Sequence, residues 1–203
     1  LFLALAATTG VALKPRTRVT HGPRRPGTQL LRAGGPDDYG YVFKDDQEPG
    51  GPTFSWIDTV GAESLSIAGD DTVGSVQLPF PFRFYGQVYN SVWVCTNGWI
   101  SFGSHPGTST YENESVPSPN LPNNAVFAFW DDLAVGEFFL GNIYARTVDT
   151  APNRKFAIIW QDVACNFMAD PVTFEVVFDE ADSSITLQYL DVLCSDPYSD
   201  SGG

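Results

Sequence analysis

Histidine, cysteine and methionine are scarce in this sequence. Its 203 residues include two histidines, His21 and His105, with three cysteines and one methionine. A Ser or Cys nucleophile needs a nearby base that a third group orients, and zinc sites need clustered His and Cys ligands. His105 is the one histidine outside the N-terminal segment, and no such cluster is present. We therefore expect a protein that is not an enzyme.

Long hydrophobic runs are also lacking. The longest, residues 1–13, would span about 20 Å as a helix at ~1.5 Å per residue, which is too short for a bilayer core of ~30 Å. We expect no membrane insertion. The run matches the hydrophobic region of a secretory signal peptide, and the alternative is a buried helix or strand. Because neither Met nor a charged leader precedes it, we expect that the sequence begins inside a longer reading frame.

Positive charge is almost absent after residue 36. Residues 1–36 carry six basic residues and no acid, whereas residues 37–203 carry five basic residues and all 24 acids, for net charges of +6 and −19. Residues 14–36 are rich in Pro, Gly and Arg and are interpreted as a linker. An acidic body repels nucleic acid phosphates and anionic lipid, so we expect neither as a partner.

Helical periodicity is missing from the body, residues 37–203, which we interpret as one domain. Short runs of alternating apolar residues lie between Gly- and Pro-rich turns. This pattern predicts an all-β fold, an antiparallel β-sandwich similar to a jelly roll. Apolar residues on both sides of 125–130 predict a central strand there. The other strands are expected at 76–84, 143–148, 156–163, 172–178 and 185–190.

The clearest local signal is Asn97-Gly98, which lies between two apolar runs and favours a type I′ hairpin turn. A two-residue loop would pair Thr96 with Trp99 and direct Trp99 away from the core. Trp99 is then a candidate aromatic platform for a sugar, although a second packed layer would explain it equally well. The residues expected to be buried are Trp93, Ile100, Phe102, Val126, Ala128, Phe174, Val176 and Leu187.

Several motifs follow one another in a familiar order: LPFPFRFYG at 78–86, YNSVWVCTNGWISFG at 89–103 and PNNAVFAFWDD at 122–132, with an opening segment at 38–52. The series resembles a β-sandwich module of secreted bacterial proteins that is often appended to subtilisin-like proteases or surface proteins. It is distantly similar to the nidogen-like extracellular domain. The resemblance implies an extracellular location and a protease or surface domain in the same full-length chain. Because such modules continue past residue 203, the C-terminus is expected to be truncated.

Adjacent acids are the candidate metal ligands. Asp131 and Asp132, or Asp45, Asp46 and Glu48, offer oxygens of the kind that Ca²⁺ accepts. The alternative is that they are solvated turn residues. A structural Ca²⁺ is the one cofactor considered. A glycosidase would need two acids facing each other across a cleft, and the sequence shows no such pair.

The three cysteines complete the set of candidate residues. Cys165 and Cys194 each follow a predicted strand, and a third strand between those two would bring both to one end of a sheet. We predict a Cys165–Cys194 disulfide and a buried free thiol at Cys95, as suits a secreted protein. Three reduced thiols in a cytosolic protein are the alternative.

Taken together, the sequence favours a secreted, non-catalytic module for adhesion or accessory binding to an extracellular protein or glycan surface. A carbohydrate-binding module is the main alternative. A glycoside hydrolase is the third.

Overall fold

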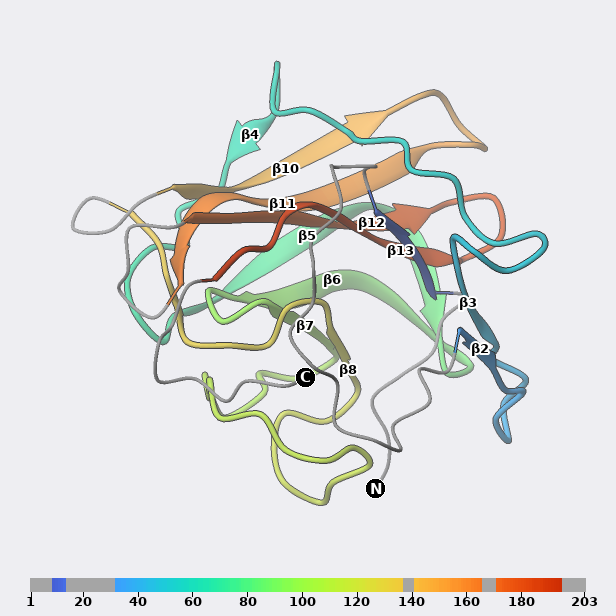
Figure 1. The fold of residues 1–203 in the computed structure, drawn as a ribbon, viewed down its shortest axis with the longest axis horizontal. Helices are drawn as coiled ribbons and strands as arrows, with labels where there is room; N and C mark the ends of the chain where they lie inside the picture. The colour runs from blue at the N-terminus through green and yellow to red at the C-terminus, as the bar shows by residue number, and fades with distance from the viewer. Residues whose placement is uncertain (1–8, 14–31, 137–140, 166–170, 195–203) are drawn as a thin grey trace.

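The computed structural model describes residues 9–13, 32–136, 141–165 and 171–194, and these residues form two packed β-sheets (Figure 1). No helix occurs among them, and thus none with the length and apolar character needed to cross a membrane. The predicted all-β sandwich is confirmed. Nearly all strand pairs are antiparallel, and the exceptions involve β1 (Thr9–Leu13), which runs parallel to both of its neighbours.

The larger sheet has the strand order β2-β3-β1-β13-β12-β11-β10-β4, with β9 paired to β11. Its centre is an antiparallel meander in which β12 lies between β11 and β13, as expected from the sequence. β-branched and aromatic residues dominate these strands, which suits a buried pleated surface. The bounds besides β1 are β2 Ala33–Gly34, β3 Phe43–Asp45, β4 Glu63–Ser64, β9 Leu133–Ala134, β10 Asn142–Val148, β11 Lys155–Cys165, β12 Pro171–Asp179 and β13 Ile185–Asp191.

The smaller sheet has the order β5-β6-β7-β8, made by Val73–Phe84, Gln87–Cys95, Trp99–Phe102 and Ala125–Phe127. The prediction of a central strand at 125–130 is wrong, because β8 is the edge of this sheet. Its residues are apolar on both sides for another reason: the larger sheet covers one face, and residues 103–124 cover the other (Figure 1).

The hairpin between β6 and β7 forms with a register different from the predicted one. Val94 lies opposite Ile100 and Trp93 opposite Ser101, so the pairing is shifted by one residue and the loop is longer than two residues. Gly98 has φ +74°, and Asn97 is not among the residues with positive φ, which excludes a type I′ turn. A shift of one residue exchanges the two faces. Val92 and Val94 therefore enter the core, and Trp93 is half-buried on the outer face.

The core lies between the two sheets and is rich in aromatic residues. Phe82 packs edge-on against Phe178, and Trp160 stacks on Phe174 with ring centroids 4.9 Å apart. Such geometries add to the stabilisation from burial itself. The predicted burial is confirmed for all but Trp93 of the eight residues, namely for Ile100, Phe102, Val126, Ala128, Phe174, Val176 and Leu187.

The larger sheet includes two segments that precede the predicted domain boundary at residue 37. β1 pairs with β13 over five residues, and Ala33–Gly34 of β2 pairs with β3. The chain before residue 37 thus contributes strands to the sheet, whereas the sequence placed all of it outside the fold. Removal of residues 1–13 as a signal peptide stays a prediction. Most of the linker, 14–31, and the C-terminal end, 195–203, lie outside the described residues.

Candidate functional site

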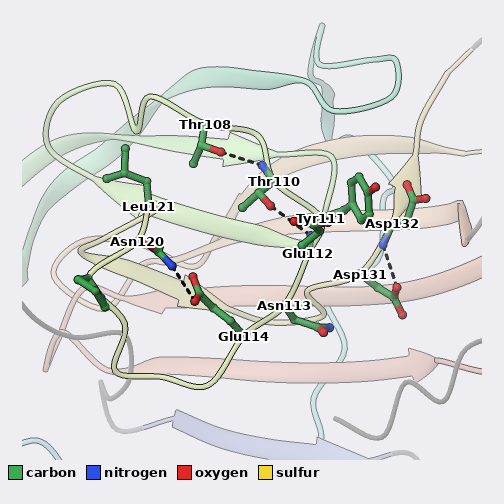
Figure 2. A pocket seen from close by; sticks show the side chains of 11 residues that line it. Thr108, Thr110, Tyr111, Glu112, Asn113, Glu114, Asn120, Leu121, Asp131 and Asp132 are labelled. Carbon is green, nitrogen blue, oxygen red and sulfur yellow. Dashed lines mark hydrogen bonds between the residues drawn. The ribbon is translucent and has the colours of Figure 1, made fainter.

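A groove of about 1060 Å³ lies beside the segment that joins β7 to β8, residues 103–124, which we call the β7–β8 connection. Its other wall is the turn between β8 and β9. Figure 2 shows Asp131 and Asp132 at one end and Leu121 with Asn120 at the other. The lining residues are Thr108, Thr110, Tyr111, Glu112, Asn113, Glu114, Pro119, Asn120, Leu121, Asp131 and Asp132.

The β7–β8 connection is fastened to the sheet by backbone carbonyls. The Thr110 carbonyl accepts hydrogen bonds from the indole N–H groups of Trp99 and Trp130, both at 3.0 Å. Asn97 Nδ2 donates to the carbonyl of Ser109 at 2.8 Å. A buried indole N–H needs an acceptor, and here two of them fix one peptide group. The groove wall is thereby held in one position.

Trp99 is not a ligand platform. Its side chain is 0% exposed, because the β7–β8 connection covers the face on which it lies. The sequence interpretation of Trp99 as an exposed sugar platform is therefore wrong, and the alternative of a second packed layer is correct. The aromatic ring that the groove does expose belongs to Tyr111, which is 43% exposed.

Asn97 organises the acidic end of the groove. Besides its bond to Ser109, Nδ2 donates to Asp71 Oδ1 at 2.6 Å, and Oδ1 accepts from the Leu133 backbone N–H at 2.8 Å. One buried amide thus joins the hairpin loop, the turn before β5, the β7–β8 connection and β9. The sequence indicates the turn propensity of Asn97 but not this role, because the partners of its side chain lie 12 to 36 residues away.

The charge of the groove is negative. Glu112, Glu114, Asp131 and Asp132 line it, and none of its lining residues is Lys, Arg or His. Burial raises the pKa of Asp132 above its ordinary value, and the charges of Asp70, Asp71 and Asp131 raise it further. Such a gathering of negative charges around Asp132 marks a place where a cation or a positively charged side chain would be stabilised.

The predicted metal ligands are only partly brought together. Asp131 Oδ1 accepts the backbone N–H of Asp132 at 2.9 Å, and the two side chains point to opposite sides of the turn (Figure 2). Asp45 Oδ1 accepts the Gln47 N–H in its own turn, and its other oxygen lies 3.4 Å from Arg32. Asp46 and Glu48 follow Asp45 in and just after this turn.

One group of three side chains with ligand atoms within 4.8 Å of one another was found in the described residues: Asp131, Cys165 and Cys194. Its two cysteines form a disulfide with Cα atoms 5.8 Å apart, which confirms the predicted pair and leaves the group without thiolates. Cys95 is buried and free, as predicted, and burial raises the pKa of its thiol to about 12. Such a thiol stays protonated and unreactive.

The groove offers hydroxyls and carboxylates. Thr108 Oγ1 and Thr110 Oγ1 accept backbone N–H groups two residues further along the connection. His105 Nδ1 accepts the Gly107 N–H at 3.0 Å, and its ring packs on Trp93. His105 does not line the groove. This arrangement can bind a ligand through charge, hydrogen bonds and one exposed ring.

Comparison with protein families identifies the relatives of this chain. A family model described as NIDO-related matches residues 40–201. The chain belongs to the NIDO-related family. The match includes the whole smaller sheet, the groove and the Cys165–Cys194 disulfide, so the candidate site is part of the NIDO-related domain. Neither a curated protein nor a solved structure matches this chain. Attachment to a bacterial protease stays an expectation from the motif resemblance.

Proposed function

We propose that this NIDO-related chain is a non-catalytic extracellular module that binds a partner protein through the acidic groove. The observation that carries the proposal is the charge of the groove, which has four acids and no basic side chain in its lining. The Thr110 carbonyl, held by two indole N–H groups, anchors the wall, so little ordering of the connection is needed on binding.

The partner that fits this groove is an extended segment with Lys or Arg side chains and an apolar residue between them. The carboxylates would attract the basic side chains, and this attraction raises association rates and selects against acidic partners. Tyr111 and Leu121, which are 43% and 50% exposed, supply apolar contact area at the groove wall. The disulfide supports an extracellular setting, because such bonds persist in oxidising compartments.

A peptide-binding measurement tests the proposal. The full chain is titrated into an array of fluorescent peptides that alternate Arg or Lys with aromatic or aliphatic residues, at low and high salt. We expect binding that weakens with salt, and about a tenfold loss for Glu112→Gln combined with Glu114→Gln, at roughly 0.5–1 kcal/mol for each exposed charge pair. The matched control is Asp149→Asn, at an exposed acid in the β10–β11 turn. Equal affinities of control and double variant would refute the site.

A glycan is the second candidate ligand, and Tyr111 favours it. Its exposed ring lies in the same groove as the amides of Asn113 and Asn120. An aromatic ring can stack on the apolar face of a sugar, and nearby amides can hydrogen-bond with its hydroxyl groups. Binding of a neutral glycan would be insensitive to salt and lost in Tyr111→Ala. The double Glu variant would keep it. This pattern separates a carbohydrate-binding module from a protein-binding one.

A further inference from the structure

Residues 53–58 cross the outer face of the larger sheet without pairing with it as a strand, and we call this segment the strap. Ile57 is buried against Ala157, Ile159 and Val177, and Trp56 packs on the same cluster. Because these three sheet residues belong to β11 and β12, the strap covers the centre of the meander. It lies on the face opposite the smaller sheet.

Three side chains of the sheet hold the backbone of the strap. The Gln188 side chain brackets Ser55: its Oε1 accepts the Ser55 N–H at 2.6 Å, and its Nε2 donates to the Ser55 carbonyl at 2.9 Å. Glu175 Oε1 accepts the Ile57 N–H at 3.1 Å and Gln188 Nε2 at 2.6 Å. At the end of the strap, Arg146 donates to the Asp58 carbonyl at 2.8 Å.

Glu175 is poorly solvated for a charged group. Its side chain is 0% exposed, and Oε2 has no hydrogen-bond partner in the described part of the chain. A carboxylate here would be buried with both donors on one oxygen. The neutral acid fits better, because it avoids the cost of burying a charge while Oε1, as a carbonyl oxygen, still accepts both N–H groups. Consistently, burial raises the pKa of Glu175 to about 8, although the hydrogen bonds from Ile57 and Gln188 lower it.

No free basic side chain lies near Glu175 in the described residues to favour its ionised form. Burial and those two hydrogen bonds account for the pKa shift, without a charge–charge contribution. β13 contributes the neutral Gln188. The ionisable residues on the elements around this face are Asp58 on the strap, Tyr144 and Arg146 on β10, Lys155 and Asp162 on β11, and Asp179 on β12. The two basic residues among them are already paired, Arg146 with Asp58 and Lys155 with Asp179.

We infer that the strap is a pH-sensitive cover of the sheet, closed over neutral Glu175 and released as this side chain ionises. When the strap opens, water reaches Glu175, which then titrates near its ordinary pKa of 4.5. The closed state therefore holds a proton that the open state loses. Opening becomes more favourable as the pH rises from about 4.5 to about 8, by up to about tenfold per pH unit, and is constant above that range.

Amide hydrogen exchange tests this inference. The exchange rates of the Ser55 and Ile57 amides are measured by NMR from pH 5 to pH 8 on the full chain and corrected for intrinsic exchange. We expect their protection to fall by up to tenfold per pH unit, while ladder amides of β12 and β13, such as Val177 and Thr186, keep theirs. Glu175→Gln should make the strap profile flat. Asp162→Asn, the same change at an exposed acid of this sheet, should leave it steep.

Three outcomes would overturn the inference. A flat profile in the wild-type chain would do so without any variant, which matters if Glu175→Gln does not fold. A profile that stays steep in Glu175→Gln would assign the pH dependence to another group. Loss of protection at Val177 and Thr186 in parallel with Ile57 would show global unfolding instead of local opening.

Discussion

At the scale of single residues, buried polar side chains decide where the peripheral segments lie. Asn97 joins four segments at the acidic end of the groove, and Glu175 with Gln188 holds the strap. In each case a side chain bonds to the backbone of the peripheral segment, whereas within a sheet the backbone of a neighbouring strand would make these hydrogen bonds. A buried polar group costs free energy unless it is hydrogen-bonded, so each of these contacts strongly favours one placement of the segment.

Gly98 permits the hairpin loop to approach the turn after β8. It has φ +74°, and a Cβ at this position would lie 1.9 Å from the Phe129 carbonyl oxygen. We expect Gly98→Ala to lower the free energy of unfolding by more than about 3 kcal/mol, because it adds a backbone clash to a strained φ angle.

Gly86→Ala is the matched control for Gly98→Ala. Gly86 has φ +75°, but a Cβ there would meet no atom within 4 Å, so only the cost of the φ angle applies, about 1 kcal/mol. Urea denaturation of both variants measures the difference. Equal destabilisation would mean that the loop moves away from Phe129 at little cost.

At the scale of elements, most strands from β5 onward could be predicted from the sequence, whereas the short strands β1 to β4 and β9 and the register of the hairpin could not. Alternating apolar residues mark β10 to β13 within a residue or two, because the period of side-chain direction is fixed by the pleat. The register at Asn97-Gly98 depends on bonds from Asn97 to Asp71, Ser109 and Leu133, all far away in the sequence.

The groove was not predictable for a related reason. It requires the β7–β8 connection to fold back over Trp99, and the connection itself shows no apolar period. A usable signal was nevertheless present: Trp99 and Trp130 both carry an N–H that must find an acceptor when buried, and here both find Thr110. Two tryptophans near an edge strand therefore indicate a covering segment.

The Cys165–Cys194 disulfide links the last residue of β11 to the segment after β13, across the meander. Its loop of 29 residues predicts a loss of about 3–4 kcal/mol of unfolding free energy when both cysteines are changed to serine, if the unfolded chain gains the corresponding entropy. Denaturant titration measures the loss. Cys95→Ala is the control: it removes a buried thiol without opening a loop, and a loss as large as that of the double variant would contradict the entropic account.

At the scale of the whole molecule, the net charge of −13 sets the conditions for binding and stability. Few basic residues are available to balance the acids of the body, and several of them are already engaged. Arg154, for example, donates to both carboxylate oxygens of Glu180 and lies over the Phe80 ring. The groove acids are left without such partners in their lining, which makes the groove the natural place for a cationic group.

We propose that Ca²⁺ binds at Asp131 and Asp132. The negative charge of the molecule favours cation binding, but it also makes stability depend on any added salt. Any salt screens the repulsion among acids and raises stability, so an effect of Ca²⁺ alone proves nothing. The comparison must be made at constant ionic strength with NaCl. A site with a dissociation constant of ~0.5 mM, typical of extracellular modules, would add about 1.4 kcal/mol to the unfolding free energy at ~5 mM Ca²⁺.

We expect this increment in the wild-type chain and its loss in Asp132→Asn, whereas Asp149→Asn should keep it. An increment that NaCl reproduces, or that survives in Asp132→Asn, would assign the effect to screening over the whole molecule and remove the site.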